Sequence, residues 1–205
     1  GQTRANYNPD GSAGRGNSNL SWPMGVAVDT SGNLFVADYG NSRVLRFPDP
    51  CADPSAEHHA DLVIGQSDFT SRETTASASH MSGPYGLALM PEGHLLVSDA
   101  NHNRVLLFRK PDGGDFTNGQ DASTVFGQFN FSTTAAGAEP YQMSDPRFIA
   151  TDSSGRLYVA DYTNRRILVF TEVNSAPSGS RAALAVTRAF GNDLLIYPHG
   201  IAVDQ

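Results

Sequence analysis

Four residues of unlike chemistry occupy one repeated position in this sequence, directly after a proline. They are Met24, Tyr85, Arg147 and His199. An arginine makes paired hydrogen bonds, a tyrosine stacks on rings, and a histidine titrates near neutral pH. An anionic or aromatic ligand would suit such a set, which we predict to be a ligand-binding group. The alternative is a loop position that varies only because nothing constrains it.

A second pattern places an aspartate five residues before an arginine, three times. The pairs are Asp38 and Arg43, Asp99 and Arg104, and Asp161 and Arg166. A carboxylate facing a guanidinium suggests catalysis or anion binding. However, a pair that is present in every copy of a repeat serves the repeat itself. Aspartate accepts backbone N–H groups in a turn and arginine pairs with it across the hairpin, so we predict structural turns.

The candidates for metal binding are few. His58 and His59 are adjacent, next to Glu57, in a loop rich in proline and aspartate. Adjacent side chains on a strand point to opposite faces, so such a pair rarely chelates one ion. Cys51 is the only cysteine, which leaves no internal disulfide and no cysteine cluster for zinc. We predict no catalytic residue, no metal site and no cofactor.

These residues belong to an internal repeat. Residues 23–47, 84–108 and 146–170 align without a gap, and a fourth copy opens at Pro198. A Gly-Gln marker recurs at residues 1, 65 and 127, with a weaker Gly-Asn at 191, at spacings of 64, 62 and 64 residues. Two markers with one period indicate a repeat architecture.

Each copy has the pattern of four short strands. In the first copy these are residues 26–28, 34–37, 44–47 and 62–64, separated by polar turns. Four antiparallel strands per repeat form a blade of a β-propeller. We therefore predict an all-β partial propeller of about thirteen strands: three four-stranded blades and the first strand of a fourth. The predicted inner strands begin near Val26, Leu87, Ile149 and Ile201.

The whole chain, 1–205, is predicted to be one propeller domain. Its repeats lie near 23–83, 84–145 and 146–197, with the start of a fourth at 198–205. The net charge of −7 argues against a nucleic-acid partner, whose phosphates need lysine and arginine. No stretch of about 18 apolar residues is present, so we expect no membrane insertion.

The repeated motifs resemble those of the NHL repeat family. Residues 25–29 read GVAVD, residues 33–38 read NLFVAD, and residues 41–44 read NSRV, with a further match at 164–167. The second copy departs from the pattern, because His102 takes the asparagine place while Arg104 is kept. Residues 65–69, GQSDF, are similar to long-repeat bacterial NHL proteins. The resemblance covers nearly the whole chain and implies an NHL-type propeller, usually of six blades.

NHL propellers include protein-binding and RNA-binding platforms and one enzyme group, the peptidyl-hydroxyglycine lyases. The resemblance implies that such a lyase would place histidines around zinc at the channel mouth, with tyrosine and arginine nearby. His199 follows Pro198 as in one such element, but it is the only histidine among the four variable residues. A catalytic zinc needs about three protein ligands. We therefore predict a non-catalytic binding or structural scaffold for a protein or small-molecule partner, with a lyase-like enzyme as the alternative.

The repeat length bears on closure of the ring. Six blades of about 62 residues need about 370 residues, and this chain has 205. We expect the remaining blades to come from the rest of a longer chain, or from a second copy. A second copy would duplicate the strand expected at 201–203, which favours the longer chain. We expect an extracellular or periplasmic bacterial protein.

Overall fold

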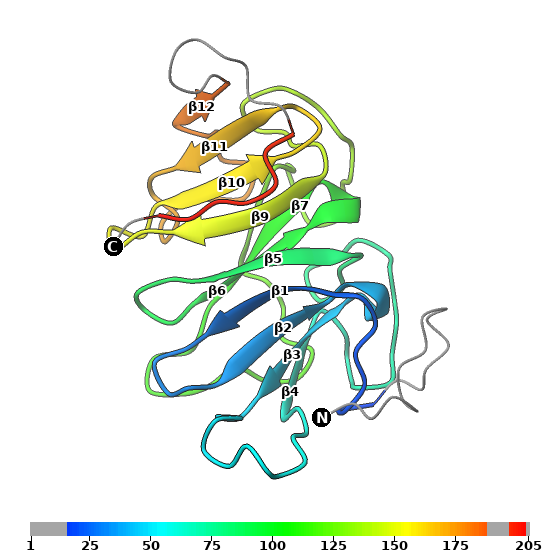
Figure 1. The fold of residues 1–205 in the computed structure, drawn as a ribbon. Helices are drawn as coiled ribbons and strands as arrows, with labels where there is room; N and C mark the ends of the chain where they lie inside the picture. The colour runs from blue at the N-terminus through cyan, green and yellow to red at the C-terminus, as the bar shows by residue number, and fades with distance from the viewer. Residues whose placement is uncertain (1–15, 188–196, 204–205) are drawn as a thin grey trace.

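The computed structural model describes residues 16–187 and 197–203, and in this part of the chain it contains three four-stranded antiparallel sheets. Each sheet is one propeller blade, with its strands in sequence order from the inner to the outer edge (Figure 1). Blade 1 contains β1 (Pro23–Val28), β2 (Leu34–Asp38), β3 (Arg43–Phe47) and β4 (Leu62–Ile64). Blade 2 contains β5 (Pro84–Leu89), β6 (Leu95–Asp99), β7 (Arg104–Phe108) and β8 (Thr124–Phe126). Blade 3 contains β9 (Pro146–Thr151), β10 (Leu157–Asp161), β11 (Arg166–Phe170) and β12 (Leu184–Val186).

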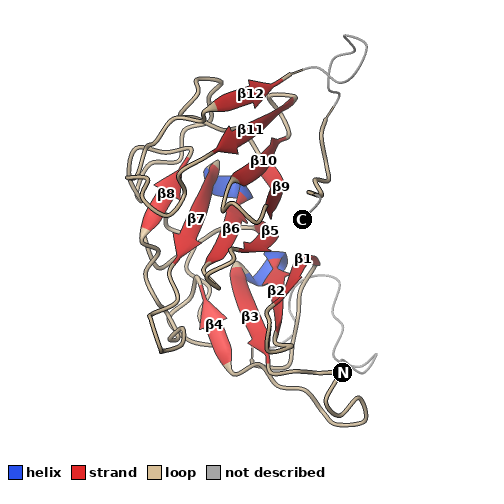
Figure 2. Ribbon diagram, turned by 90° about the vertical axis from the view of Figure 1, so that its left-hand side faces the viewer, coloured by secondary structure: helices blue, strands red, loops and turns tan. Residues whose placement is uncertain are grey.

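The all-β propeller fold predicted from the repeats is confirmed. The inner strands β1, β5 and β9 are neighbours on the channel side, while β4 and β8 lie at the outer edge (Figure 2). Two short 3-10 helices, η1 (Tyr39–Asn41) and η2 (Ala100–His102), join the second and third strands of blades 1 and 2. Within the described residues no helix is long and apolar enough to cross a membrane.

The start of the fourth repeat differs from the expected strand. Residues 198–203 return to the channel side beside β9, where the first strand of a fourth blade belongs (Figure 1). They are not paired as a strand, so the described residues carry twelve strands rather than thirteen. In blades 1 to 3 the inner strand pairs with the strand that follows it in the hairpin, and residues 198–203 have no such partner among the described residues. The markers at residues 1–2 and 191–192 lie outside the described residues.

The inner strands begin three residues earlier than expected, at the repeat prolines. Pro23 pairs with Asp38 on β2, but the next paired residue on β1 is Val26, so the register shifts across a β-bulge. The same shift separates Pro84 from Leu87 and Pro146 from Ile149. A bulge leaves residues unpaired and turns their side chains away from the regular alternation. The variable position after each proline lies inside this bulge.

The Asp–Arg pairs lie buried where the second and third strands of each blade meet. The Arg104 Nε donates to Asp99 Oδ2 at 2.7 Å, and both side chains are fully buried. The other Arg104 nitrogens donate to the carbonyls of Ser77, His80 and Phe131, at 3.0, 2.8 and 2.5 Å. The arginine therefore fastens the loop before the blade and the loop after it to the same turn.

The other two blades repeat this arrangement. Arg43 donates to Asp38 at 2.8 Å and Arg166 to Asp161 at 2.6 Å, and each arginine also binds carbonyl oxygens of the preceding loop. Burial raises the pKa of Asp38 and of Asp161, while hydrogen bonds from a backbone amide and from the arginine oppose that rise. These contacts agree with structural turns, the role that the sequence predicts for all six residues.

Removal of a buried arginine from this turn should be costly. We predict that Arg104→Met lowers the free energy of unfolding by about 3–5 kcal/mol, because it leaves the Asp99 carboxylate and three loop carbonyls without their donor. The control is Arg109→Met, since Arg109 makes one exposed hydrogen bond to the Asn174 carbonyl. The control should cost less than about 1 kcal/mol in urea unfolding. Equal losses in the two variants would contradict the structural role.

The apolar core lies between blades. One cluster joins blades 1 and 2 and includes Phe35, Leu87 and Leu106, and a second joins blades 2 and 3 and includes Phe126 and Ile149. Leu87 and Ile149 are 7% and 5% exposed because each packs against the preceding blade. Val26 holds the same position in blade 1 and is 63% exposed. The inner strand of blade 1 therefore presents an apolar side chain that an adjoining blade would cover. The residues level with Val26 on the other strands, Val36, Leu45 and Val63, are buried in a cluster of their own.

This difference gives a matched pair of substitutions. We predict that Leu87→Ala lowers the unfolding free energy of the 205-residue chain by about 2–4 kcal/mol, because it opens a cavity between blades. Val26→Ala should change it by less than about 0.5 kcal/mol, since most of that side chain is already in water. The measurement is urea unfolding, with sedimentation to establish that the chain is monomeric. A large loss for Val26→Ala in the monomer would show that blade 1 is already covered.

Candidate functional site

Three of the four variable residues meet at the end of the channel where the inner strands begin. Arg147 Nη1 lies 2.6 Å from His199 Nε2, and the Tyr85 ring lies 5.9 Å from the His199 ring and 5.5 Å from the Arg147 guanidinium. We call these three residues, together with Asp145, Phe148 and Tyr162, which contact them, the mouth cluster. Met24 occupies the same bulge on β1 and is 39% exposed. The ring and guanidinium contacts that join the other three do not include it.

The Arg147 side chain is the centre of the mouth cluster. Its guanidinium lies 3.5 Å from the centre of the Tyr162 ring, a cation–π contact. Its Nε and Nη2 both donate to Asp145 Oδ2, at 3.0 and 2.9 Å. Burial acts to lower the pKa of Arg147, but the hydrogen bond and the charge of Asp145 outweigh it and raise that pKa. Arg147 is therefore a fixed cation with a counter-ion beside it.

The Arg147–His199 contact fixes the role of one imidazole nitrogen. A guanidinium can only donate, so Nε2 of His199 accepts in this contact and carries no proton. The edge of the same ring meets Tyr162 at 5.4 Å, and its plane is tilted against Phe148 at 6.1 Å. His199 is thus attached by side-chain contacts to β9 and to Tyr162, which directly follows β10.

Three members of the cluster, Asp145, Phe148 and Tyr162, were missed in the sequence. Phe148 takes a place that is glycine in the other copies, Gly25, Gly86 and Gly200. A Cβ at Gly25 would lie 2.4 Å from the Tyr85 carbonyl, and one at Gly86 would lie 2.5 Å from the Arg147 carbonyl. These glycines let neighbouring inner strands approach closely. The departure at Phe148 was therefore a readable signal.

The residue before each proline shares one backbone conformation. It has a positive φ in every copy, and the four residues are Trp22, Gly83, Asp145 and Tyr197, at 50, 64, 52 and 50°. This backbone region is unfavourable for residues other than glycine, and it costs on the order of 1–3 kcal/mol at each of the three non-glycine sites. Trp22 and Tyr197 are 54% and 44% exposed. The strained positions present aromatic or charged side chains next to the bulge.

Ser98 supports the backbone under Arg147. It is fully buried on β6, where the other blades carry Ala37 and Ala160. Its hydroxyl accepts from the Gly86 N–H at 2.7 Å and donates to the Arg147 carbonyl oxygen. One hydroxyl therefore joins the bulge of β5 to the bulge of β9. Ser98 is a positioning residue for the mouth cluster.

This hydroxyl can be removed without changing the shape of the blade, because alanine is the residue in blades 1 and 3. We predict that Ser98→Ala lowers the unfolding free energy by about 1–2 kcal/mol, because it leaves the Gly86 amide and the Arg147 carbonyl without a partner. Urea unfolding measures the loss. Ser123→Ala is the control, since Ser123 bonds to the Leu107 carbonyl through both its backbone amide and its hydroxyl. An equal or smaller loss for Ser98→Ala would contradict the bridging role.

The described residues do not fit a zinc site. His199 is the one histidine in contact with the mouth cluster, and no group of three metal-binding side chains occurs in the described part of the chain. His59 lies in an exposed loop, 2.6 Å from the Ser18 hydroxyl and 3.8 Å from Glu57. Further ligands for a catalytic zinc would have to come from other blades.

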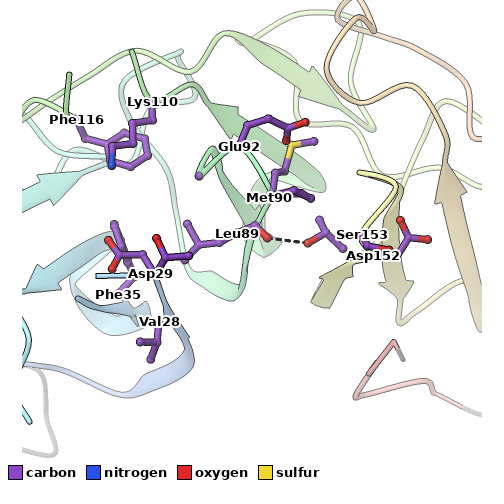
Figure 3. A pocket seen from close by; sticks show the side chains of 14 residues that line it. Val28, Asp29, Phe35, Leu89, Met90, Glu92, Lys110, Phe116, Asp152 and Ser153 are labelled. Atoms are coloured by element: carbon purple, nitrogen blue, oxygen red, sulfur yellow. Dashed lines mark hydrogen bonds between the residues drawn. The ribbon is translucent and has the colours of Figure 1, made fainter. Parts of the chain in front are cut away.

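A cavity of about 470 Å³ lies at the opposite end of the inner strands (Figure 3). Phe35, Met90 and Phe116 supply apolar lining, and the hairpin residues Asp29 and Asp152 also border it. Both carboxylates accept backbone N–H groups of their own hairpins, Asp29 from Ser31 and Asn33 and Asp152 from Ser154 and Arg156. These two carboxylates are therefore engaged in turn formation.

The comparisons with known proteins agree with the repeats. The family model of the NHL repeat matches residues 20–47 and 143–170. Two solved structures share the fold: a protein of unknown function from Desulfotomaculum acetoxidans, with a TM-score of 0.53 and 12% identity, and the hydrazine synthase of Kuenenia stuttgartiensis, with a TM-score of 0.51 and 13% identity. Each match covers 89% of this chain, and 48% and 39% of the respective structures. The fold is thus a partial β-propeller, and two segments of the chain match the NHL repeat.

Two curated relatives have a limited similarity. They are the peptidylglycine alpha-amidating monooxygenase of Rattus norvegicus and the corresponding protein of Mus musculus. Each is 27% identical over 150 residues, which is 72% of this chain and 13% of the relative. The chain therefore spans about an eighth of the length of these relatives.

Proposed function

We propose that this protein is a non-catalytic binding scaffold and that the mouth cluster is its ligand site. The observation that carries the proposal is the position of the variable residues. The blades repeat one another, yet Tyr85, Arg147 and His199 differ at one equivalent position and touch each other. They lie in or beside strained and bulged backbone, which is frequent at binding sites.

The cluster has the groups that a small ligand or a protein side chain would need. Tyr85 and Tyr162 supply rings for stacking, and Arg147 supplies N–H donors held in a fixed plane. Met24, 39% exposed on the adjacent strand, adds an adaptable apolar side chain at the rim. The exposed Trp22 and Tyr197 extend the aromatic surface.

The proposal includes further blades next to blade 1 and blade 3, where single apolar side chains are exposed. Val26 is 63% exposed on blade 1 and Leu184 is 55% exposed on blade 3, whereas the equivalent Leu87 and Leu62 are 7% and 2% exposed. A blade of the same kind would cover each of these side chains. We propose that the rest of a longer chain supplies these blades, with a second copy as the alternative source.

Substitution of Arg147 tests the proposed ligand site. We predict that Arg147→Ala weakens ligand binding at least about tenfold, because it removes the cation–π and hydrogen-bonding group at the centre of the mouth. Binding is measured by ligand-observed NMR against a panel of small planar aromatic compounds, both neutral and anionic. The melting temperature should stay within a few degrees, since the Arg147–Asp145 ion pair is accessible to solvent, with side chains 22% and 35% exposed, and such pairs contribute little to stability.

Arg109→Ala is the control. Arg109 makes one exposed hydrogen bond, to the Asn174 carbonyl, and contacts no residue of the mouth cluster. It should leave the affinities within about twofold. Compounds that bind equally well to the wild-type protein and to Arg147→Ala would place the site elsewhere.

The curated relatives favour a second candidate, an enzyme active at the channel mouth. Their names describe amidation chemistry on peptidylglycine, and the lyase-like alternative from the sequence belongs to the same candidate. This candidate needs metal ligands from blades beyond this chain, because His199 is the one histidine that touches the mouth cluster among the described residues. Zinc bound stoichiometrically by the complete parent protein, and lost in His199→Ala, would favour the enzyme over the scaffold.

A further inference from the structure

We propose that Asp145 sets the charge selectivity of the mouth cluster, so that the site takes a planar, uncharged ring bearing an N–H donor and rejects the corresponding anion. This inference rests on the proposed function, because it specifies the ligand class of the same site. It starts from the one carboxylate in contact with Arg147 among the described residues.

Asp145 is held in place by its backbone. Its N–H donates to Asn103 Oδ1 at 2.9 Å. Asp145 lies directly before Pro146 and has a positive φ of 52°. The equivalent residues in the other copies are Trp22, Gly83 and Tyr197, none of which is charged. A carboxylate is therefore not needed for the turn itself. The third copy, which has this aspartate before the proline, is also the copy with an arginine after it, in the bulge.

The ion pair neutralises the cation of the site. Both hydrogen bonds from Arg147 fall on Oδ2 of Asp145, at 3.0 and 2.9 Å, and the neutral Nε2 of His199 receives the third. The combined charge of Asp145, Arg147 and the His199 contact is close to zero. An entering anion gains attraction from Arg147 but meets repulsion from the adjacent carboxylate, and it must also lose its hydration.

A neutral ring avoids this repulsion. The Tyr85 and Tyr162 rings and the Arg147 plane offer faces for stacking that need no charge on the ligand. No hydrogen bond among the described residues uses Oδ1 of Asp145, which leaves an acceptor for a ligand N–H next to the stacking surface. An aromatic amide or an N–H heterocycle has both features.

The test uses two probes of the same shape, naphthamide and naphthoate. The first is neutral and donates N–H groups, and the second is an anion without donors at neutral pH. Their dissociation constants are measured by ligand-observed NMR on the 205-residue chain, the variant Asp145→Asn and the control Asp121→Asn. Asparagine tolerates a positive φ as well as aspartate does, so the turn is retained. The control removes one negative charge from an exposed residue of blade 2, between β7 and β8.

The wild-type protein and Asp121→Asn should bind naphthamide at least about fivefold more tightly than naphthoate. Asp145→Asn should reverse the preference, with about a tenfold gain for naphthoate, because Arg147 then has no counter-ion. If the wild-type protein binds both probes equally or prefers naphthoate, or if Asp145→Asn leaves the ratio unchanged, Asp145 does not select the charge, while the site remains. If neither probe binds any of the three proteins, both the inference and the proposed site are wrong.

Discussion

The buried ion pair between aspartate and arginine is the interaction on which each blade depends. It closes the turn between the second and third strands, and the same guanidinium binds carbonyls of loops that lie about 24–28 residues away in the sequence. A charge so deeply buried is tolerated only when every donor has an acceptor. No buried side-chain nitrogen or oxygen in the described residues lacks a hydrogen-bond partner. Long loops can therefore vary without loosening the blade, because their ends are tied to a fixed group.

The mouth cluster is a consequence of this rigid frame. Asp38, Asp99 and Asp161 lie opposite the repeat prolines in the strand register, so the buried pairs and the bulges occupy the same end of each blade. The bulge leaves the residue after the proline unpaired in the sheet. The residue before the proline, which has a positive φ, contributes a second side chain outside the regular sheet. The frame stays constant while both positions change, so the mouth cluster is a group of side chains that the repeats do not share.

The sequence was sufficient for the parts of the structure that repeat. The four-stranded blades, their turns and the paired Asp99 and Arg104 follow from the period, because each copy confirms the others. Even His102, which breaks the motif, keeps the function of asparagine by placing Nδ1 2.9 Å from Asp99 Oδ2. The site could be predicted only in part. The variable position identified Tyr85, Arg147 and His199, but Asp145 and Tyr162 join them through a turn conformation and a side-chain direction that a linear pattern does not contain.

The phenylalanine at position 148 has an effect on the symmetry of the ring. Glycine in the first two copies, Gly25 and Gly86, allows adjacent inner strands to meet almost backbone to backbone, with no room for even a methyl group. Phe148 carries a full ring there, with its centroid 5.1 Å from the Tyr85 ring and 6.1 Å from the His199 ring. The close backbone approach at the position of Gly25 and Gly86 therefore has no counterpart on β9, where aromatic side chains make the contact instead. The junctions between successive inner strands are thus not equivalent, and the rotational symmetry of the blades ends at the mouth cluster.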